Sequence, residues 1–516
     1  MAFAIDDRRQ EVATWTGFAM MCIGMFMALL DTQVVVTSLP TIQRALNIPP
    51  DQMSWIQTAY LISEIISIPL TGLLTRVLGI RRLFVAAVSF FTFASIGCAH
   101  SAGFASLIVW RIFQGFSGGT LIPAVFAAVF LLFPYRLQTL ATMIASVLAV
   151  LAPTIGPLVG GWVTETYTWP WLFLINVVPG VIVAIVGLFF LPKTPAQFDQ
   201  IKGLDTIALV FGAGALAMLE IAIKEAPDRG WMSPLVAGLF LLCLIAAGLF
   251  IWRTLRTVNP LVDIRTFRNR NFSIGCALSF VIGMGLYGSI YLMPVFLAYV
   301  RGHNALEIGE IMLVTGIAQL ACAPLVAALL RRFDARVLSA IGFLMLSLGA
   351  ILSADQTRTT DFNEMFAGQL VRGCAFMFCV LPPTELALGK LPPLSIPDAS
   401  GLFNLMRNLG GAVGIGIIDS IIFGQSPKHA QALYDGLVAG NEKVFATLGV
   451  TRDAVMQAAI DPDKRAAMAS LLKKVAFADA INDAWFALSI MTAAIVVVLL
   501  LAKSAPPSRE ALIIEP

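Results

Sequence analysis

Long runs of apolar residues recur along almost the whole of this 516-residue chain. Most runs hold about 20 residues or more, enough for a helix to cross the roughly 30 Å hydrocarbon core of a bilayer. Because lipid offers the backbone no hydrogen-bond partners, a spanning segment must satisfy its own peptide groups, and a helix does this. We therefore predict an all-α integral membrane protein with fourteen transmembrane helices. The predicted spans cover residues 14–38, 55–75, 83–99, 104–132, 138–163, 171–191, 205–224, 234–252, 272–298, 307–330, 336–353, 364–389, 399–424 and 480–502.

Basic residues are distributed unevenly between the segments that connect these spans. With the N-terminus inside, nineteen Lys and Arg residues lie in cytoplasmic segments and five lie in short external loops. Positive charge favours the cytoplasmic side of a membrane. The first apolar block is too long for the core of a signal peptide, so we interpret it as a retained span. The pattern predicts a multi-pass protein of the cell inner membrane with both termini in the cytoplasm.

The composition argues against several classes of protein. Charged residues make up 13% of the chain, against roughly 25% in soluble domains. The net charge of +3 is not gathered on one segment, so no nucleic-acid partner is expected. The three histidines lack metal-ligand spacing, and no HExxH motif, CxxC pair or GxxxxGK[ST] nucleotide-binding segment is present. We predict neither an enzyme nor a metal site nor a cofactor.

The second half of the chain weakly repeats the first. Residues 366–383 echo residues 104–123, with Phe-Ala, an arginine and a proline in the same order. Two similar halves related by an axis along the membrane normal are typical of secondary transporters. With fourteen spans, the seventh and eighth are interpreted as an inserted pair. The predicted units are an N-terminal six-helix bundle at 1–192, an inserted pair at 193–258 and a C-terminal six-helix bundle at 259–516, which includes a periplasmic loop at 425–479.

Ionisable residues inside apolar segments are costly and mark candidate functional positions. At ~1.5 Å per residue from the outer end of each span, Asp31, Glu64 and Arg111 fall at similar depths. An Asp31–Arg111 contact is therefore possible. A carboxylate that takes a proton on one side of the membrane and releases it on the other can drive transport. We predict that these three residues couple transport to protons. A static ion pair is the alternative for Asp31, and a cavity residue without coupling duty is the alternative for Glu64.

Four further charges occur in spans of the second half. Glu385 and Arg407 fall near the inner side and are predicted to form an inner-gate or packing pair. Arg372 and Asp419 fall near the outer side. Asp419 is expected either to pair with Arg372 or to face an external vestibule.

Aromatic, methionine and amide side chains in the spans are candidates for binding a lipophilic substrate, because they combine apolar area with a few polar contacts. Simple helix packing is the alternative for each of them. The candidates are Gln33, Gln57, Tyr60, Gln114, Tyr287, Tyr291, Met293, Gln319 and Phe376.

Five stretches of the chain, at residues 30–40, 72–79, 107–119, 152–161 and 259–272, resemble motifs of the major facilitator superfamily. In this order they resemble the fourteen-span drug:proton antiporters of the EmrB/QacA family, closer to EmrB, along almost the whole chain. The resemblance implies the major facilitator fold, with two six-helix bundles plus two inserted helices. The gating residues it implies are Gly72, Arg76, Gly79 and Arg81 in the loop motif and Pro153, Gly156, Pro157, Gly160 and Gly161 in the antiporter motif.

The chain departs from these motifs at two places. Arg76 stands where the loop motif of the superfamily usually has aspartate, so a charge relay that needs this carboxylate is not expected. The antiporter motif also lacks its first glycine upstream of Pro153.

The resemblance implies a proton-coupled antiporter that exports lipophilic drugs or toxic organic compounds across the inner membrane. The alternative is a dedicated exporter of one natural product, such as a siderophore or a fatty acid. The implied partners are a small lipophilic substrate, protons and the lipid bilayer, together with a periplasmic adaptor protein and an outer-membrane channel. The 425–479 segment is the predicted adaptor-docking surface, and a solvated loop packed on the bundle is its alternative.

Overall fold

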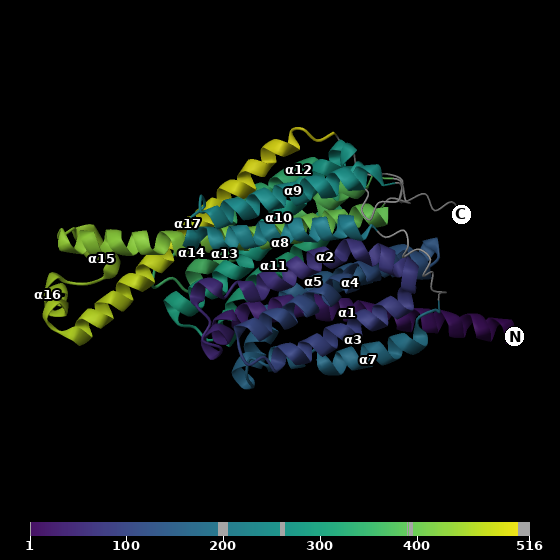
Figure 1. Ribbon diagram of the computed structural model, residues 1–516, viewed down its shortest axis with the longest axis horizontal. Coiled ribbons are helices and arrows are strands. Elements are labelled where there is room, and N and C mark those ends of the chain that lie inside the picture. The colour runs from purple at the N-terminus through teal and green to yellow at the C-terminus, as the bar shows by residue number, and fades with distance from the viewer. Residues whose placement is uncertain (1, 194–204, 258–263, 390, 392–395, 504–516) are drawn as a thin grey trace.

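The computed structural model describes residues 2–193, 205–257, 264–389, 391 and 396–503. Within these residues every regular element is a helix, and most helices run roughly along one long axis (Figure 1). The start of α1 (Ala2–Ala45) and the end of α17 (Pro462–Leu499) lie at one end of the molecule. The short helices α15 (Glu442–Leu448) and α16 (Arg452–Ile460) lie at the opposite end, which we call the outer end. This arrangement agrees with an even number of crossings.

The helices follow the predicted order. The N-terminal part contains α1, α2 (Trp55–Leu78), α3 (Ile80–Ala99), α4 (Phe104–Leu132), α5 (Tyr135–Thr166), α6 (Trp171–Leu174) and α7 (Val177–Phe190). Next come α8 (Thr206–Arg229) and α9 (Pro234–Arg256). The C-terminal part contains α10 (Arg270–Phe296), α11 (Ala305–Leu330), α12 (Ala335–Ile351), α13 (Phe362–Leu388), α14 (Ile396–Val438), α15, α16 and α17. Three short elements, η1 (Pro50–Gln52), η3 (Ile264–Arg268) and η4 (Leu297–Arg301), lie at helix ends.

Twelve of the helices in the described segments are long and apolar enough to cross a membrane. Two others, α2 with 24 residues and α12 with 17, are not among the twelve but pack inside the same bundle. With these two, the bundle is compatible with fourteen crossings. The count of fourteen stays a prediction, because α2 is not among the twelve and α12 is shorter than any of them.

Side-chain caps explain where two spanning helices begin. The Asn304 side chain accepts a hydrogen bond from the Glu307 backbone, and Glu307 accepts one from the Asn304 backbone, each at 2.9 Å. Asp361 and Glu364 form the same reciprocal arrangement at the start of α13. Each cap satisfies amide groups that a helix start leaves without partners. The caps therefore fix the residues at which the α10–α11 loop and the α12–α13 loop end.

The inserted helices α8 and α9 lie at the edge of the bundle. Large apolar side chains of α9, including Leu241, Leu244 and Trp252, are exposed, as expected of a surface that faces lipid. On the other side, Ile223 of α8 packs on Gly416 of α14. The pair is thus attached to the C-terminal part. The predicted boundary at 258–259 lies outside the described residues.

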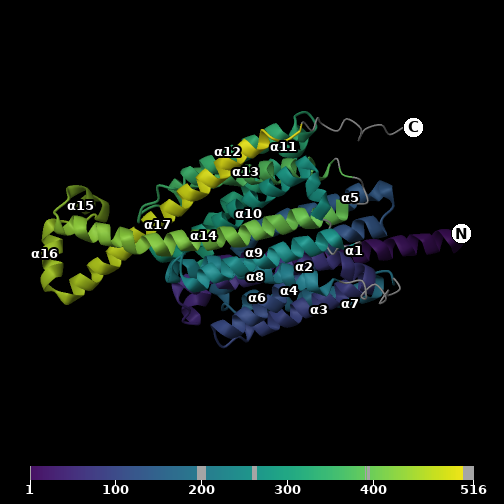
Figure 2. The ribbon, with the colours of Figure 1, turned by 45° about the horizontal axis from the view of Figure 1, so that its top comes forward.

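Residues 425–479 form a helical hairpin that projects from the outer end (Figures 1 and 2). We predicted a loop with short amphipathic helices, and α15 and α16 are such helices. However, α14 continues to Val438 and α17 already begins at Pro462, so the spanning helices themselves make up most of this outer hairpin. Leu437, Leu448 and Val475 form its small apolar core. Packing of this core stabilises helices that would be marginal alone in water.

Candidate functional site

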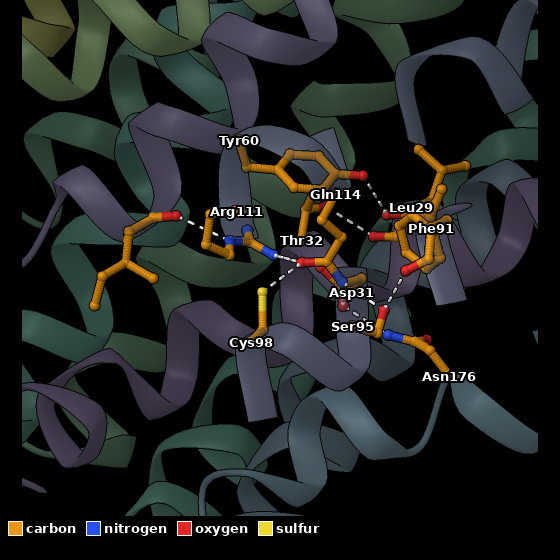
Figure 3. A network of polar contacts seen from close by, with 12 residues as sticks. Leu29, Asp31, Thr32, Tyr60, Phe91, Ser95, Cys98, Arg111, Gln114 and Asn176 are labelled. Carbon is orange, nitrogen blue, oxygen red and sulfur yellow. Dashed lines mark hydrogen bonds and ion pairs between the residues drawn. The ribbon is translucent and has the colours of Figure 1, made fainter. Parts of the chain in front are cut away.

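Arg111 on α4 and Asp31 on α1 form a fully buried ion pair (Figure 3). Arg111 Nη1 lies 2.6 Å from Asp31 Oδ2, and neither side chain is exposed. Arg111 also donates from Nε to the Ile56 carbonyl at 3.0 Å and from Nη1 to Gln114 Oε1 at 2.8 Å. The structure brings together two charges that the sequence placed at one depth. Good geometry and further hydrogen bonds offset the large cost of burying such charges.

Two amides hold the other oxygen of the Asp31 carboxylate (Figure 3). Asp31 Oδ1 accepts from Gln114 Nε2 at 2.8 Å and from Asn176 Nδ2 at 2.7 Å. Gln114 also donates to Ser95 Oγ at 2.9 Å and accepts from Cys98 Sγ at 3.5 Å. The network therefore joins α1, α3, α4 and the residue before α7. It lies within the N-terminal bundle and not between the bundles.

Asn176, Ser95 and Cys98 were not among the site residues predicted from the sequence. Asn176 is an amide inside the predicted span 171–191, and that position was the only available signal. Serine and cysteine are common small residues of spanning helices, so Ser95 and Cys98 carried no signal of their own.

Tyr60 of α2 covers the guanidinium. The centre of its ring lies 4.4 Å from Arg111 Cζ, a distance at which the ring face attracts a cation. Glycines of α4 allow this approach. A Cβ atom at Gly115 would collide with the Tyr60 carbonyl oxygen, and one at Gly119 would lie 2.7 Å from the Glu64 carbonyl oxygen. The small residues after Arg111 therefore place α2 directly against the ion pair.

Glu64 lies one turn beyond Tyr60 on α2 and faces the C-terminal bundle. Its side chain is buried, and no described residue hydrogen-bonds to Oε2. Asn408 of α14 hydrogen-bonds to the carboxylate, and the Arg407 guanidinium is close enough to attract it. Tyr287 of α10 donates to Asn408 Oδ1 at 3.4 Å. Glu64 thus connects the two bundles, whereas Asp31 is enclosed in one of them.

The antiporter motif, residues 152–161 of α5, lies between α1 and α11. On one side, Gly156 packs on Gln33 and Gly160 packs on the backbone of Val34. On the other side, Thr154 Oγ1 donates to the Gly316 carbonyl at 3.3 Å. Because α1 and α5 belong to the N-terminal bundle and α11 to the C-terminal one, the motif forms part of the seam between the bundles. Pro153, Pro157 and Gly161 lie in the same stretch, and Gly161 packs on the Ala305 backbone.

Polar contacts join the bundles near the outer end of this seam. Tyr299 donates to Gln43 Oε1 at 3.0 Å, and the Ala305 backbone donates to Glu165 Oε1 at 3.1 Å. Asp419 of α14 accepts hydrogen bonds from Tyr291 Oη at 2.6 Å and from the Ser54 hydroxyl at the start of α2. These contacts hold the outer ends of the bundles together.

Among the described residues, neither the predicted Glu385–Arg407 pair nor the Arg372–Asp419 pair, one of the two alternatives for Asp419, is formed. Arg372 donates from Nη1 to the Gly349 carbonyl at 3.1 Å, so it faces α12 and not Asp419 on α14. Arg407 donates to Asn404 Oδ1 at 2.7 Å within its own helix. Glu385 is exposed and lies over Gly389 at the end of α13. The side chains of each pair point in different directions, which depth along a helix does not reveal.

The loop motif connects α2 and α3. Gly79 adopts φ of 79° and its amide donates to the Thr75 carbonyl at 2.9 Å, which ends α2 and starts α3 after a single residue. Glycine is favoured in this left-handed conformation. Gly72 is exposed, Arg81 is partly buried at the start of α3, and the side chain of Arg76 lies outside the described part of the chain.

Three of the candidate substrate residues line a cavity of about 30 Å³ between α5 and α10, α11 and α13. They are Met293, Gln319 and Phe376. The others lie at helix contacts outside this cavity. Tyr60 and Gln114 contact the Arg111 ion pair, and Gln33 contacts Gly156. Tyr291 contacts Asp419, and Tyr287 contacts Asn408. Gln57 is buried, and neither of its amide atoms has a hydrogen-bond partner among the described residues. The cavity has room for one or two water molecules.

Residues 115–119 spell GxSxG, the sequence that places a serine nucleophile on a sharp turn in some hydrolases. Here the segment is inside α4, and Ser117 Oγ donates to the Phe113 and Gln114 carbonyls of its own helix at 3.0 and 2.9 Å. The serine is therefore not presented as a nucleophile. Across the described segments, no three His, Cys, Asp or Glu side chains could jointly hold a metal ion.

Two packed helical bundles with a polar seam and buried opposite charges define a multi-pass secondary transporter. The family model of the Major Facilitator Superfamily matches residues 21–415. The chain therefore belongs to this superfamily and, as its relatives indicate, to the EmrB type. It is 38% identical over 429 residues to the colistin resistance protein EmrB of Acinetobacter baumannii, covering 83% of this chain and 84% of that protein.

Two further comparisons agree with this assignment. The multidrug export protein EmrB of Escherichia coli K12 is 30% identical over 414 residues, covering 79% of this chain and 80% of that protein. The crystal structure of a bacterial homolog of the human lysosomal transporter Spinster, inward-facing and unoccupied, matches with a TM-score of 0.60. That match covers 95% of this chain and 96% of the other at 13% identity, so it concerns the fold alone.

Replacing Gly160 with valine is expected to destabilise the protein. A Cβ atom there would collide with the Val34 carbonyl oxygen and the Thr37 hydroxyl, so α1 and α5 would have to separate. Overpacking of this kind costs about 1–3 kcal/mol. Thermal unfolding of the purified protein measures the loss. Gly238→Val on α9 is the control, because a Cβ there meets nothing within 4 Å. Equal melting temperatures for the two variants would contradict the close packing of α5 on α1.

Proposed function

We propose that this protein exports lipophilic drugs or other toxic organic compounds across the cell inner membrane in exchange for protons. The observation that carries the proposal is the buried Asp31–Arg111 pair, linked through Tyr60 to Glu64 at the seam between the bundles. Carboxylates buried in this way are expected to mark proton pathways. Two relatives are named for multidrug export and for colistin resistance, and this supports the type of cargo.

In the proposed mechanism, Glu64 exchanges the proton. It faces the opposite bundle, so parting of the bundles would give it access to water. Within the described segments, one of its carboxylate oxygens has no partner to displace. Protonation would weaken its attraction to Arg407 and thereby loosen the contact between α2 and α14. Asp31 takes part through Arg111, which balances its charge and stacks on Tyr60, one turn from Glu64. Proton binding and bundle movement are coupled through these contacts.

The conformational cycle follows from the position of the seam contacts. The hydrogen bonds of Asp419, Tyr299 and Glu165 close the outer end in the present state. Export requires that these contacts break together while contacts nearer the termini form, as in alternating access. The orientation that we propose, with both termini cytoplasmic, makes the outer end periplasmic and agrees with the distribution of basic residues.

A vesicle assay tests the exchange. We expect purified protein in proteoliposomes to accumulate a lipophilic dye when the lumen is acidified, and to release protons from the lumen as the dye enters. The readouts are an entrapped pH indicator and dye fluorescence. Glu64→Gln should abolish the proton release while the protein remains folded and monodisperse.

Dye movement without proton release would contradict antiport. Full proton release by Glu64→Gln would exclude Glu64 as the exchanging group. The assay also distinguishes multidrug export from the alternative function. A dedicated exporter would move one natural compound and none of several unrelated dyes.

We further propose that the outer hairpin docks a periplasmic adaptor protein that leads to an outer-membrane channel. The hairpin projects far beyond the bundle and carries exposed apolar side chains, among them Val438, Met456 and Ile460. Isolated exposed apolar residues are ordinary, but several on one projecting element favour a protein contact. An adaptor would prevent a lipophilic compound released into the periplasm from diffusing back.

Replacing residues 440–461 with a short Gly-Ser linker tests this docking role. We expect transport in proteoliposomes to be unchanged, because the spanning helices remain, while resistance in cells and co-purification with an adaptor are lost. Lys464→Gln, an exposed polar change on the same hairpin, serves as the control. If the linker variant keeps both resistance and adaptor binding, the hairpin is only a connector.

A further inference from the structure

Helix α9 of the inserted pair is the least buried of the twelve long apolar helices in the described segments. Leu244, Gly248, Trp252 and Arg256 follow one another at intervals of four residues, so they lie in one row along its surface. All four residues are exposed. Another side of the helix packs on α8 through Phe250. The row therefore faces lipid over most of its length.

The middle of this row has a gap. A Cβ atom at Gly248 would meet nothing within 4 Å, and the large apolar side chains of Leu244 and Trp252 lie on either side of it. Leu244 is 71% exposed and Trp252 is 51% exposed. The gap and its two apolar borders offer contact area to an acyl chain that lies along the helix.

The inner end of the row is cationic. The Arg256 guanidinium carbon lies 4.6 Å from the centre of the Trp252 ring, so the indole holds the charge at the end of the apolar row. Arg265 of η3 donates from Nη2 to the Leu255 carbonyl at 3.1 Å. This bond brings a second guanidinium to the last turn of α9, next to Arg256.

Positive charge exceeds negative charge around this turn. Arg253 is paired with Asp205 at 2.5 Å, whereas no carboxylate pairs with Arg256 among the described residues. Residues 252–270 contain five arginines and one aspartate, a net charge of +4. An anion at the end of α9 would therefore be attracted.

This turn lies at the level expected of lipid headgroups. η3 leads into α10, where Asn271 exchanges two hydrogen bonds with the Lys503 backbone, at 2.9 and 3.2 Å. Lys503 follows the end of α17, which lies opposite the outer hairpin (Figure 1). Tryptophan and arginine at the end of a spanning helix are typical of the membrane interface. The cations are thus placed beside the headgroups of the inner leaflet.

We propose that the inner end of α9 binds an anionic phospholipid, with its phosphate diester on Arg256 and Arg265 and an acyl chain along the row past Trp252 to Gly248. Guanidinium groups bind phosphate oxygens through paired N–H donors. A zwitterionic headgroup binds less well, because its ammonium group is repelled by the excess positive charge. The lipid holds the end of the inserted pair next to the start of α10. This site depends on neither the proton exchange nor the cargo proposed above.

Lipid binding to the full-length purified protein tests the headgroup preference. The protein is titrated separately with phosphatidylglycerol and with phosphatidylcholine of identical acyl chains, and native mass spectrometry measures the affinity for the first bound lipid. We expect the wild type to bind phosphatidylglycerol at least about 5-fold more tightly. Arg256→Gln should weaken phosphatidylglycerol binding about 5-fold and change phosphatidylcholine binding by less than about 2-fold.

Arg332→Gln is the matched control for the loss of charge. Arg332 is an exposed arginine without a stacked ring, and it lies at the same end of the molecule, since Arg336 donates to the Ala502 carbonyl at 3.0 Å. This variant should weaken phosphatidylglycerol binding by less than about 2-fold. Equal losses in the two arginine variants would mean a general attraction to basic residues and would overturn the proposal. So would a wild type without a preference for phosphatidylglycerol.

A second pair of variants tests the position of the acyl chain without a change of charge. Gly248→Leu fills the gap in the row and should weaken the binding of both lipids by a few fold. Gly238→Leu, near the start of the same helix, should weaken neither, although a Cβ atom there also meets nothing within 4 Å. Identical affinities for the two glycine variants would show that the chain does not lie along this row.

A soluble phosphate separates a lipid site from a site for small phosphates. Glycerol 3-phosphate carries the anionic group without acyl chains and should not displace phosphatidylglycerol at millimolar concentration. Displacement would overturn the lipid assignment. Because every readout is lipid binding, failure of this proposal leaves the export function standing, and failure of export in vesicles leaves this site standing.

Discussion

Asp31→Asn is expected to abolish proton-driven export while the protein still inserts into the membrane and binds substrate. The substitution removes the negative charge that faces Arg111 at 2.6 Å and leaves the guanidinium buried without a counter-ion. It also places an amide group where two amide donors now point, those of Gln114 and Asn176. Breaking a buried pair in this way costs about 3–5 kcal/mol of stability. Export in acid-loaded vesicles and the melting temperature are the measurements.

Asp205→Asn is the matched control for this loss. Asp205 also pairs with an arginine, Arg253 at 2.5 Å, but the pair lies at the inner end of the inserted helices and Arg253 is partly exposed. Asp205→Asn should therefore lower the melting temperature less than Asp31→Asn does, and export should be preserved. Full export by Asp31→Asn at a physiological gradient would exclude Asp31 from coupling and leave a structural ion pair, provided that both variants are folded.

Arg111→Lys is expected to impair export and to change its dependence on pH, although the charge is kept. The guanidinium bonds simultaneously to Asp31, Gln114 and the Ile56 carbonyl, and its flat face stacks on Tyr60. A lysine ammonium is a compact point charge on a flexible stem and has no planar fork. It can hold Asp31 but cannot keep α2 and α4 in the same positions. Initial export rates over a range of external pH measure both effects.

Arg229→Lys provides the comparison for this change, because Arg229 is exposed and bonds only to Glu225 in its own helix among the described residues. It should be indistinguishable from the wild type. A lowered rate with an unchanged pH profile in Arg111→Lys would support a packing role and count against coupling through the ion pair.

Much of the candidate site could be predicted from residue type and position in the sequence. A charged residue inside an apolar segment is rare enough to be noticed one residue at a time, so Asp31, Arg111 and Glu64 were identified without a fold. Depth along a helix follows directly from its rise per residue, and this correctly suggested that Asp31 and Arg111 can meet. The structure alone shows that the glycines after Arg111 bring α2 close to α4.

The errors in the second half have a common cause. Depth states how far along a span a side chain lies, but not the direction in which it points around the helix axis. Arg372 and Asp419 were at comparable depths, yet Arg372 points to α12 and α17 and Asp419 points to α10 and α2. The sequence also does not reveal the direction in which Asn176 points. Nothing in its segment indicated which helix its amide would face, so it was not predicted.

The amino-acid sequence by itself determined that this protein is a bundle of membrane-spanning helices with a few buried charges. Lipid cannot satisfy the backbone, so apolar runs of this length must be helical, and a charge within them must find a partner. Only the tertiary structure decided which partners those are. It enclosed Asp31 within one bundle, placed Glu64 between the two, and put Arg372 beside a cavity in the seam. The physical reason is that helix rotation and crossing are set by side-chain packing between segments far apart in the chain, and packing of that kind has no local signature.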